Sequence, residues 1–320
     1  MSSTDSARIV ESVIPPESDG LRLDHYLRTR FTYRSRNEWQ EAVRRGEIRI
    51  NGSPARASKL LRSGDRLAFD PGSVEEPEVD TSWSLLYESE EYLAVNKPGQ
   101  LPAHPSGRFF RNTLWSLLKE RYGELHLVNR LDRETSGVTL AAKDPNTAHL
   151  LSGLFAGRQS VKKYLAFVHG VFPAELTADG FLSDDRKSPV RKKRRFSLKE
   201  TFGSESAQTE VRSLGTDGEI SLVEALPNTG RLHQIRATLC SLGFPMVGDK
   251  LYGLDDTIYL RYIESAMTDA DETNLMIRRQ ALHASELSFF CPFRKKEIIF
   301  KAPLPNDLSG LYRRCLGVIV

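Results

Sequence analysis

A lone aspartate, Asp132, stands between two arginines in the segment Arg130-Leu131-Asp132-Arg133. A Thr135-Ser136-Gly137 turn follows it and leads into an apolar stretch with the pattern of a strand. An acid in this setting is a candidate for chemistry, because nearby guanidinium groups favour an ionised carboxylate. An aspartate that caps the backbone of its own turn gives the same local pattern, and the segment alone does not separate the two interpretations.

Four more segments carry residues that could line a site. Lys163-Tyr164 opens a strand-like run that ends at His169, and Gly230 opens a helical pattern with Arg231 and Arg236 about one turn apart. The other two segments are Gly248-Asp249-Lys250-Leu251-Tyr252-Gly253 and Leu282-His283-Ala284. Any one of these segments by itself would be weak evidence for a site.

The motifs of several common enzymes are missing. The sequence has no GxGxxG or GxxxxGK phosphate-binding loop, no HExxH pair and no GxSxG elbow. Its seven histidines do not pair at ligand spacing, and Cys240, Cys291 and Cys315 are far apart with no CxxC pair. We therefore expect no nucleotide cofactor, no metal site and no disulfide framework.

With these segments in this order, the chain resembles the RluA-type pseudouridine synthases, which isomerise uridine to pseudouridine in ribosomal or transfer RNA. The resemblance covers residues 83 to about 302 and includes an earlier Val95-Asn96-Lys97-Pro98-Gly99 segment. Several motifs in one order are specific where a single motif is weak. The resemblance implies an isomerase that acts on specific uridines of structured RNA, in 23S ribosomal RNA or in transfer RNA, and needs no cofactor.

The resemblance assigns roles to four residues. Asp132 matches the family's reacting aspartate, which acts either as a nucleophile at the sugar or as a base that forms a glycal intermediate. Arg236 would pair with Asp132 and hold it ionised, and Tyr164 would pack against the target base. Arg130 matches the residue that enters the space left by a uridine flipped out of its stack. The alternatives are a structural ion pair for Arg236 and an ordinary core aromatic for Tyr164.

Two positions depart from the family pattern, because Asn129 and Phe244 stand where histidine is common. The family assigns no chemistry to either position, so we expect them to affect substrate fit more than activity. Lys97 and the basic run Arg191–Arg195 are weaker candidates for contacts with RNA phosphates.

Positive charge is concentrated near the N-terminus. The whole chain has a net charge of only +3, but twelve Arg or Lys and six acids give +6 between residues 21 and 70. Eleven of the twelve are arginines, whose planar fork suits phosphate, although a solvated surface is the alternative. Residues 20–70 resemble the alpha-L type RNA-binding module of a small-subunit ribosomal protein. This resemblance implies RNA contacts through Arg34, Arg36, Arg44, Arg45 and Arg49.

Residue patterning divides the chain into four parts. We expect disorder over residues 1–18, a small α/β module over 20–70, a Pro- and acid-rich linker over 71–82, and a catalytic domain over 83–320. In the catalytic domain, irregularly spaced helices favour an α+β fold with a mixed, mostly antiparallel sheet flanked by helices. Strand patterns cover 84–87, 93–96, 138–142, 164–169, 220–226, 287–290 and 298–300, and helical patterns cover 112–122, 146–156 and 232–242.

Composition limits the remaining possibilities. With 39% hydrophobic and 27% charged residues, the chain is able to form a packed core. It has no run of about 18 apolar residues that could span a membrane and no secretory signal, so we expect a cytoplasmic protein, with a monomer as the default. Two other classes stay open: a non-catalytic RNA-binding or ribosome-assembly protein, and a nucleoside hydrolase. A hydrolase would need a calcium-binding Asp cluster or a second positioned acid.

Overall fold

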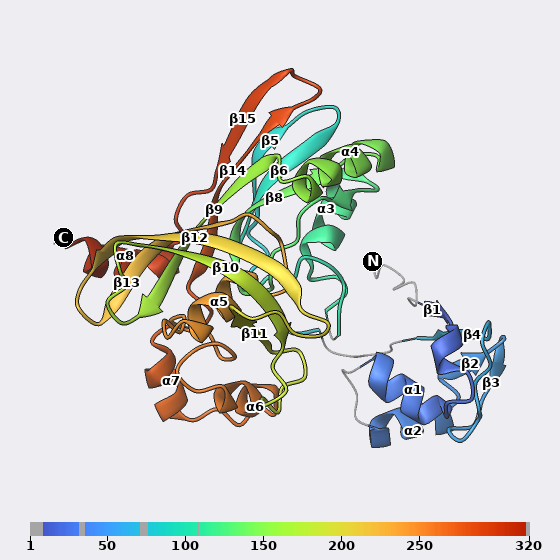
Figure 1. Ribbon diagram of the computed structural model, residues 1–320. Helices are drawn as coiled ribbons and strands as arrows, with labels where there is room; N and C mark the ends of the chain where they lie inside the picture. The colour runs from blue at the N-terminus through green and yellow to red at the C-terminus, as the bar shows by residue number, and fades with distance from the viewer. Residues whose placement is uncertain (1–8, 32–35, 71–75, 108, 318–320) are drawn as a thin grey trace, which may run out of the picture. The chain divides into compact units, whose positions relative to one another are not determined.

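The computed structural model describes residues 9–31, 36–70, 76–107 and 109–317 of the chain. Two compact units are present (Figure 1). The first is taken from residues up to Glu78 together with Pro105–Arg111, and the second from Val79–His104 and from Asn112 onward. The chain therefore passes between the units at Glu78–Val79, inside the segment predicted as a linker, and again at each end of Pro105–Arg111.

The first unit packs two helices against a small sheet. Its elements are β1 (Val10–Val13), the 3-10 turn η1 (Pro16–Ser18), α1 (Leu23–Arg30), α2 (Arg36–Arg44), β2 (Ile48–Ile50), β3 (Ser53–Pro54) and β4 (Arg66–Phe69), with the strands in the order β1-β4-β2-β3. Apolar residues at helical spacing, such as Leu23 and Leu27, meet Trp39 of α2 in one core. Asn51 and Gly52 connect β2 to β3, and both residues have a positive φ, as a tight hairpin turn requires.

The disorder predicted for residues 1–18 is wrong for residues 10–18. β1 pairs antiparallel with β4 from Val10↔Phe69 to Val13↔Arg66, and the Ile14 side chain is buried in the core. The strand is short and its partner lies far along the chain, so local composition gave no sign of the pairing. Residues 1–8 lie outside the described residues.

The second unit is built on one long mixed sheet. Its strands are β5 (Ser84–Glu88), β6 (Tyr92–Lys97), β7 (His126–Leu127), β8 (Ser136–Ala142), β9 (Ser160–His169), β10 (Glu175–Asp184), β11 (Arg194–Ser197), β12 (Glu205–Thr216), β13 (Ile220–Pro227), β14 (Leu282–Cys291) and β15 (Lys296–Lys301). The order is β11-β10-β12-β13-β9-β14-β8-β6-β5, with β15 on β14 and β7 on β8. Among the described strands only β14 and β8 pair parallel.

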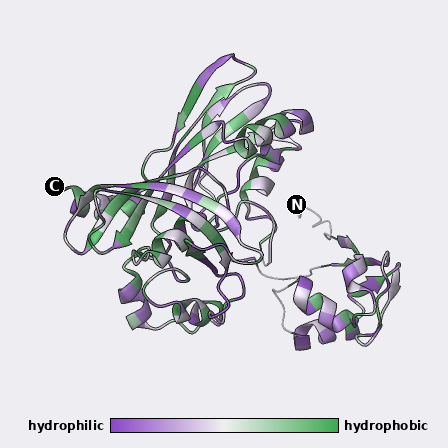
Figure 2. Cartoon of the chain, in the orientation of Figure 1, coloured by the Kyte–Doolittle hydropathy of each residue, from purple (hydrophilic) through white to green (hydrophobic). Residues whose placement is uncertain are grey.

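Six helices flank this sheet within the described residues: α3 (Leu114–Tyr122), α4 (Pro145–Ala156), α5 (Gln234–Ser241), α6 (Thr257–Ile263), α7 (Asp269–Leu275) and α8 (Asn306–Leu316). Figure 1 shows α3 and α4 beside β6 and β8, and α5, α6 and α7 grouped near β11. In Figure 2, green hydrophobic segments recur along the strands, and purple hydrophilic segments are seen on the helices. The predicted α+β class with a mixed, mostly antiparallel sheet is confirmed.

Candidate active site

Asp132 lies in a turn that connects β7 to β8. The Thr135 backbone N–H donates to the Asp132 carbonyl at 3.1 Å, which closes the turn just before β8 begins. Gly137, the second residue of β8, has a φ of +117°, and a Cβ there would lie 2.1 Å from the Ala284 carbonyl of β14. Glycine at this position therefore allows β8 to lie directly beside β14, which fixes the point where the Asp132 turn meets the sheet.

The side chain of Lys97 supports the same turn. Its side chain is fully buried, and its ammonium donates to the backbone carbonyls of Pro98 at 2.9 Å, Leu101 at 2.8 Å and Arg133 at 3.1 Å. These three acceptors match the three N–H groups of an ammonium. The prediction that Lys97 contacts RNA phosphate is wrong, because the ammonium is enclosed and occupied by the loop that carries Asp132.

Arg236, in the first turn of α5, joins Asp132 to a second acid. Its Nη1 donates to Asp132 Oδ2 at 2.7 Å, while its Nε and Nη2 bind both oxygens of Asp249 at 2.6 and 2.9 Å. Asp249 Oδ1 also accepts the backbone N–H groups of Leu251 and Tyr252, each at 2.9 Å. The predicted pairing of Arg236 with Asp132 is present, and Asp249 holds the guanidinium in one orientation.

The electrostatics of this cluster keep Asp132 charged. Burial alone would raise the pKa of the Asp132 carboxyl, but the Arg236 guanidinium, together with His233 and the hydrogen bond from Gln280, holds that pKa below its usual range. The Asp132 side chain is still 29% exposed, compared with 9% for Arg236 and 1% for Asp249. Of the two acids, Asp132 is therefore the one that a ligand is able to reach.

A cavity of about 570 Å³ opens beside Asp132. Its size lies within the usual range for a small-molecule site. Its wall includes the predicted site residues Arg130, Asp132, Tyr164 and Arg236, together with the apolar Ile235 and Leu282. The structure thus brings together, around one cavity, four residues from three segments that are far apart in the sequence.

Tyr164 contributes an aromatic wall from β9. Burial raises the pKa of its phenol to about 12, and the negative charge of Asp132 adds to the increase. The hydroxyl is therefore protonated at neutral pH. Tyr164 also packs against the cluster around Ile235 and Leu282, so its position is fixed by the core on one side and open to the cavity on the other.

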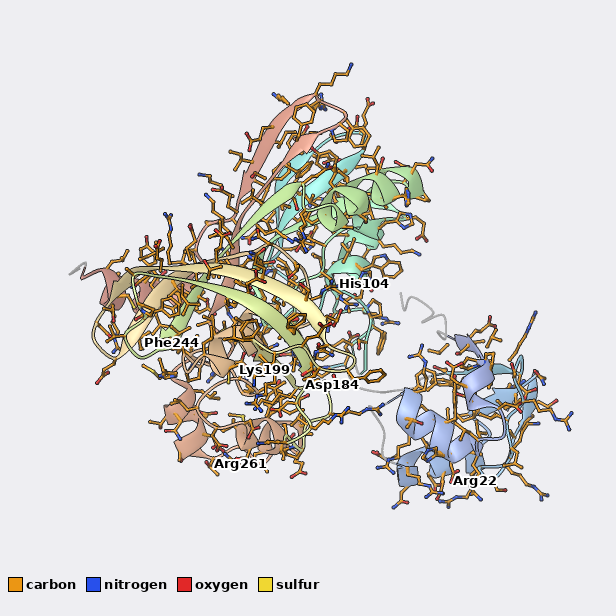
Figure 3. The ribbon with its side chains drawn as sticks, viewed as in Figure 1. Arg22, His104, Asp184, Lys199, Phe244 and Arg261 are labelled. Carbon is orange, nitrogen blue, oxygen red and sulfur yellow. The ribbon has the colours of Figure 1, made fainter. Side chains whose placement is uncertain are left out.

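Arg130 is exposed at the cavity wall and has no acidic partner among the described residues. The pKa of His104 is lowered by burial and further by the charge of Arg130. His104 stacks on Trp115 of α3 with ring centroids 6.5 Å apart (Figure 3). An exposed arginine without an acidic partner at a cavity wall keeps its donors free for an anionic ligand.

The arginines of the first unit that were predicted to contact RNA differ in whether an acidic side chain already binds them. Arg36 donates to the buried Asp24 at 2.9 and 3.1 Å, and Arg44 and Arg45 pair with Glu41 at 2.7 Å and Glu47 at 2.5 Å. Arg49 is exposed on β2 without a partner among the described residues. Arg34 lies outside the described residues.

The basic run Arg191–Arg195 is divided in a similar way. Lys193 pairs with Asp256 at 2.7 Å, and Arg194 pairs with Asp184 and Glu205, each at 2.8 Å. Arg191 and Arg195 are exposed and have no ion pair among the described residues. The middle of the run therefore stabilises the β10–β11 region, and its two ends remain available to a ligand.

The two departures from the family pattern have structural partners. The side-chain amide of Asn129 donates to the Val138 carbonyl at 3.1 Å and accepts the Leu140 N–H at 2.7 Å, so it ties the Asp132 segment to β8. Phe244 packs on Phe172 with ring centroids 4.6 Å apart (Figure 3). Asn129 also lines the cavity, whereas Phe244 does not appear in its wall.

Sequence reasoning missed three residues of this site. Asp249 lies in one of the segments named above but was given no role. Gln280 was not considered, and its side-chain amide donates to Asp132 Oδ2 at 3.4 Å and to Thr135 Oγ1 at 2.6 Å. His233 lines the cavity with a φ of +54° and contacts the Tyr252 hydroxyl through Nδ1 at 3.0 Å. Burial, then Arg236, lower the pKa of His233 to about 4. No local spacing predicts these contacts, because each partner lies on a different segment.

No group of three or more His, Cys, Asp or Glu side chains in the described ranges could hold a metal ion. No helix in that part of the chain is long and apolar enough to cross a membrane.

Family comparisons agree with both units. The model of the RNA pseudouridylate synthase family matches residues 91–241, and the model of the S4 domain matches residues 21–67. The solved structure of human RNA pseudouridylate synthase domain containing 4 matches with a TM-score of 0.58 and 26% identity, covering 72% of this chain and 92% of that one.

Curated relatives match over almost the whole chain. The RNA pseudouridine synthase YlyB of Bacillus subtilis is 30% identical, covering 92% of this chain and 94% of the relative. Ribosomal large subunit pseudouridine synthase C of Buchnera aphidicola is 31% identical over 91% of this chain and 92% of its own length. The mitochondrial tRNA pseudouridine(32) synthase of Saccharomyces cerevisiae is 30% identical over 71% of this chain and 49% of its own. The chain therefore belongs to the RluA-type RNA pseudouridine synthases, with an S4 RNA-binding domain in its N-terminal part.

Proposed function

We propose that this isomerase modifies specific uridines of a structured ribosomal or transfer RNA, with Asp132 as the reacting carboxylate. One observation carries the proposal: Arg236 holds the Asp132 carboxylate at 2.7 Å in the wall of a cavity that Tyr164 also lines. Relatives named for the ribosomal large subunit and for transfer RNA support both classes of RNA as substrates. The relatives that act on ribosomal RNA also support a cytoplasmic location.

The reaction requires an ionised acid but no redox step. The bond between C1′ of the ribose and N1 of uracil breaks, and a bond between C1′ and C5 forms. The ring loses the proton of C5 and gains one at N1, so atoms and electrons balance. Asp132 would either bond to C1′ between these steps or remove a proton from the sugar to leave a glycal. Its lowered pKa supports both routes, because both need the carboxylate form.

The target base must leave its stack before it is able to reach Asp132, at a cost of a few kcal/mol. Arg130 would enter the space left behind, which its exposure and lack of an acidic partner support. Tyr164 would pack on the uracil ring. Because the pKa of Tyr164 is raised to about 12, its phenol suits packing and proton donation better than proton removal.

Pseudouridine mapping of total RNA tests this function and identifies the substrate. We expect a strain that lacks the gene to lose pseudouridine at one or a few positions of ribosomal or transfer RNA. Wild-type protein should restore those positions and the Asp132→Asn variant should not. An unchanged pseudouridine map would contradict the proposal that these RNAs are the substrates, and restoration by Asp132→Asn would contradict the role of Asp132. The result also separates an isomerase from a non-catalytic RNA-binding protein.

A further inference from the structure

Besides Arg130, two cations in the cavity wall have no anion to pair with. Arg158 and Lys162 both line the cavity beside Asp132, and neither has a side-chain hydrogen bond or an ion pair among the described residues. Two further cations at the cavity are neutralised: Arg236 binds Asp132 and Asp249, and Arg231 lies 3.3 Å from Glu205. The wall that holds Arg158 and Lys162 is therefore short of negative charge.

The strand pattern of β9 directs Lys162 toward the site. Successive side chains of a strand alternate between its two faces, so Lys162 and Tyr164 share a face and lie about 7 Å apart along it. Lys163 takes the opposite face, where its ammonium pairs with Glu286 of β14 at 3.0 Å. Partial burial lowers the pKa of Lys162, which is the cost of holding an unpaired charge away from water.

Arg158 reaches the same cavity from the turn between α4 and β9. It has a φ of +57°, an uncommon backbone conformation for a residue with a side chain. Its N–H donates to the Phe155 carbonyl at 3.3 Å, and the N–H of the next residue donates to the Leu154 carbonyl at 2.9 Å. The backbone of α4's last turn thus sets the direction in which Arg158 leaves the helix.

An arginine fork and a lysine point charge on one wall are suited to a phosphate group. We propose that Arg158 and Lys162 form a subsite for the backbone phosphate next to the target uridine, and so position that nucleotide against Tyr164 and Asp132. This inference rests on the proposed function, since it takes RNA as the ligand. The competing ligand is the uracil ring itself, which becomes electron-rich when its bond to the sugar breaks. A phosphate is favoured because Arg158 is an exposed residue of the cavity wall, where a backbone phosphate of a bound RNA would also be in contact with water.

A substitution series with a neutral phosphate analogue tests the subsite. The probe is a stem-loop containing a uridine that the mapping experiment identifies, prepared with one methylphosphonate either 5′ or 3′ of that uridine. Affinity is measured in the Asp132→Asn background, and single-turnover rates are measured with Asp132 intact. Lys162→Met should weaken RNA binding about ten-fold at 0.1 M salt. It should also lower the slope of log affinity against log salt concentration by about one. The methylphosphonate at one of the two positions should weaken wild type similarly but cause no further loss in Lys162→Met.

Two variants serve as controls. Lys163→Met removes an adjacent ammonium on the other face of β9 and should leave the RNA affinity and the methylphosphonate effect as in wild type. Lys162→Arg should restore most of the affinity, which separates a lost charge from a misfolded strand. Arg158→Gln should behave as Lys162→Met does, with a loss that is not additive with the methylphosphonate at the same position.

Three results would overturn the subsite. The first is a Lys162→Met protein with wild-type affinity and a reduced rate at saturating enzyme, which would place the charge on the reacting uracil. The second is additive losses for Lys162→Met and both methylphosphonates, which would show that neither phosphate touches Lys162. The third is an equal loss of affinity in Lys163→Met. Pseudouridine formation by wild-type protein in the unmodified stem-loop is measured first, before any Lys162 variant is compared. If none forms, the proposed function fails for that RNA, which is a separate result from failure of the subsite.

Discussion

The charge state of Asp132 depends on its neighbours. Burial raises the pKa of this carboxyl, and Arg236, with smaller effects of His233 and Gln280, lowers it below its usual range. If Asp132 reacts as proposed, the guanidinium is a positioning group that also sets the useful pH range. Asp249 completes the arrangement, because its two oxygens accept from Nε and Nη2 of Arg236 and hold the guanidinium in one orientation.

Removing the charge of Arg236 should make activity depend on pH. In Arg236→Gln, burial is opposed only by His233 and Gln280, so the pKa of Asp132 rises and the acid limb of the single-turnover rate should move up by at least about one pH unit. Arg236→Lys keeps a charge but loses the fork, so its limb should stay near that of wild type while the rate falls. Rates between pH 5 and 9 at saturating enzyme measure this. Identical acid limbs in all three proteins would show that Arg236 does not control the protonation of Asp132.

Arg130 should matter in proportion to how tightly the target uridine is stacked. If the side chain fills the gap left by the flipped base, it offsets an unstacking cost that an already extruded nucleotide does not impose. Arg130→Ala should therefore lose activity steeply on a folded stem-loop, and far less when the uridine lies in a bulge or opposite an abasic site. Single-turnover rates of both proteins on both RNAs measure this. An equal deficit on the two substrates would mean that Arg130 contacts only phosphate.

Motifs predicted residues that line the cavity but not the residues that support them. Asp132, Tyr164, Arg130 and Arg236 all lie in the wall of one cavity, while their roles in the reaction stay predictions. The burial of Lys97 was not predicted. Nothing in the sequence around this lysine distinguishes an ammonium exposed to water from one that donates to three backbone carbonyls. Contacts between distant segments decide such roles, and a single sequence does not contain them.

At the scale of elements, the place where β8 meets β14 positions the Asp132 turn. These strands form the one parallel pair among the described strands, at His283↔Ser136 and Ala284↔Gly137. The Ser136 hydroxyl contacts His283 Nδ1 at 3.0 Å, and His283 Nε2 lies 3.2 Å from the Ala302 carbonyl. Burial lowers the pKa of His283 to about 4, so this link is uncharged at neutral pH. The close approach of the two strands depends on Gly137.

Gly137→Ala should therefore be strongly destabilising. The new Cβ would lie 2.1 Å from the Ala284 carbonyl at a φ of +117°, so the strands must separate as well as accept strain. We expect a loss of about 3–4 kcal/mol in the free energy of unfolding, measured with urea. Gly218→Ala is the matched control: its φ is +94° but a Cβ meets nothing within 4 Å, so about 1 kcal/mol is expected. Equal losses in both variants would show that the strand contact contributes nothing.

The elements predicted from sequence were those with clear apolar patterns. β6, β8, β13 and α4 combine buried residues with recognisable starts. β10 and β12 were missed because polar and charged residues alternate along them, and β10 contains a glycine at Gly180 where a Cβ would meet the Ser197 carbonyl at 2.5 Å. α6 and α7 are short, and tertiary contacts such as the pairing of Arg261 (Figure 3) with Asp271 at 2.6 Å stabilise them.

In the molecule as a whole, the residues proposed for the reaction and the arginine-rich segment lie in different units. The residues around Asp132 belong to the second unit, while the first unit carries the arginine-rich segment that matches the S4 domain. Within that segment, Arg28, Arg49 and Arg66 are exposed and have no side-chain partner among the described residues. The first unit is therefore expected to supply affinity for RNA without supplying a reacting group.

Replacing those three arginines by glutamine in the full chain should lower the slope of log affinity against log salt by about three. The rate at saturating enzyme should stay within a few-fold of wild type, because the Asp132 cavity is intact. Arg44→Gln with Arg45→Gln is the control, since Glu41 and Glu47 already pair with these residues and a smaller change in slope is expected. An unchanged slope in the triple variant would show that the exposed arginines of the first unit do not contact RNA.

The most direct test of the whole account is the fate of Asp132 in a single turnover. An RNA carrying tritium at C5 of the target uridine releases that tritium only when the base is rejoined through C5. Asp132→Asn should release less than about 1% of the tritium that wild type releases, yet bind the RNA within a few-fold of wild type, because an acid does not attract phosphate. Tritium release above that level by a correctly folded Asp132→Asn protein would contradict the assignment of Asp132 as the reacting carboxylate.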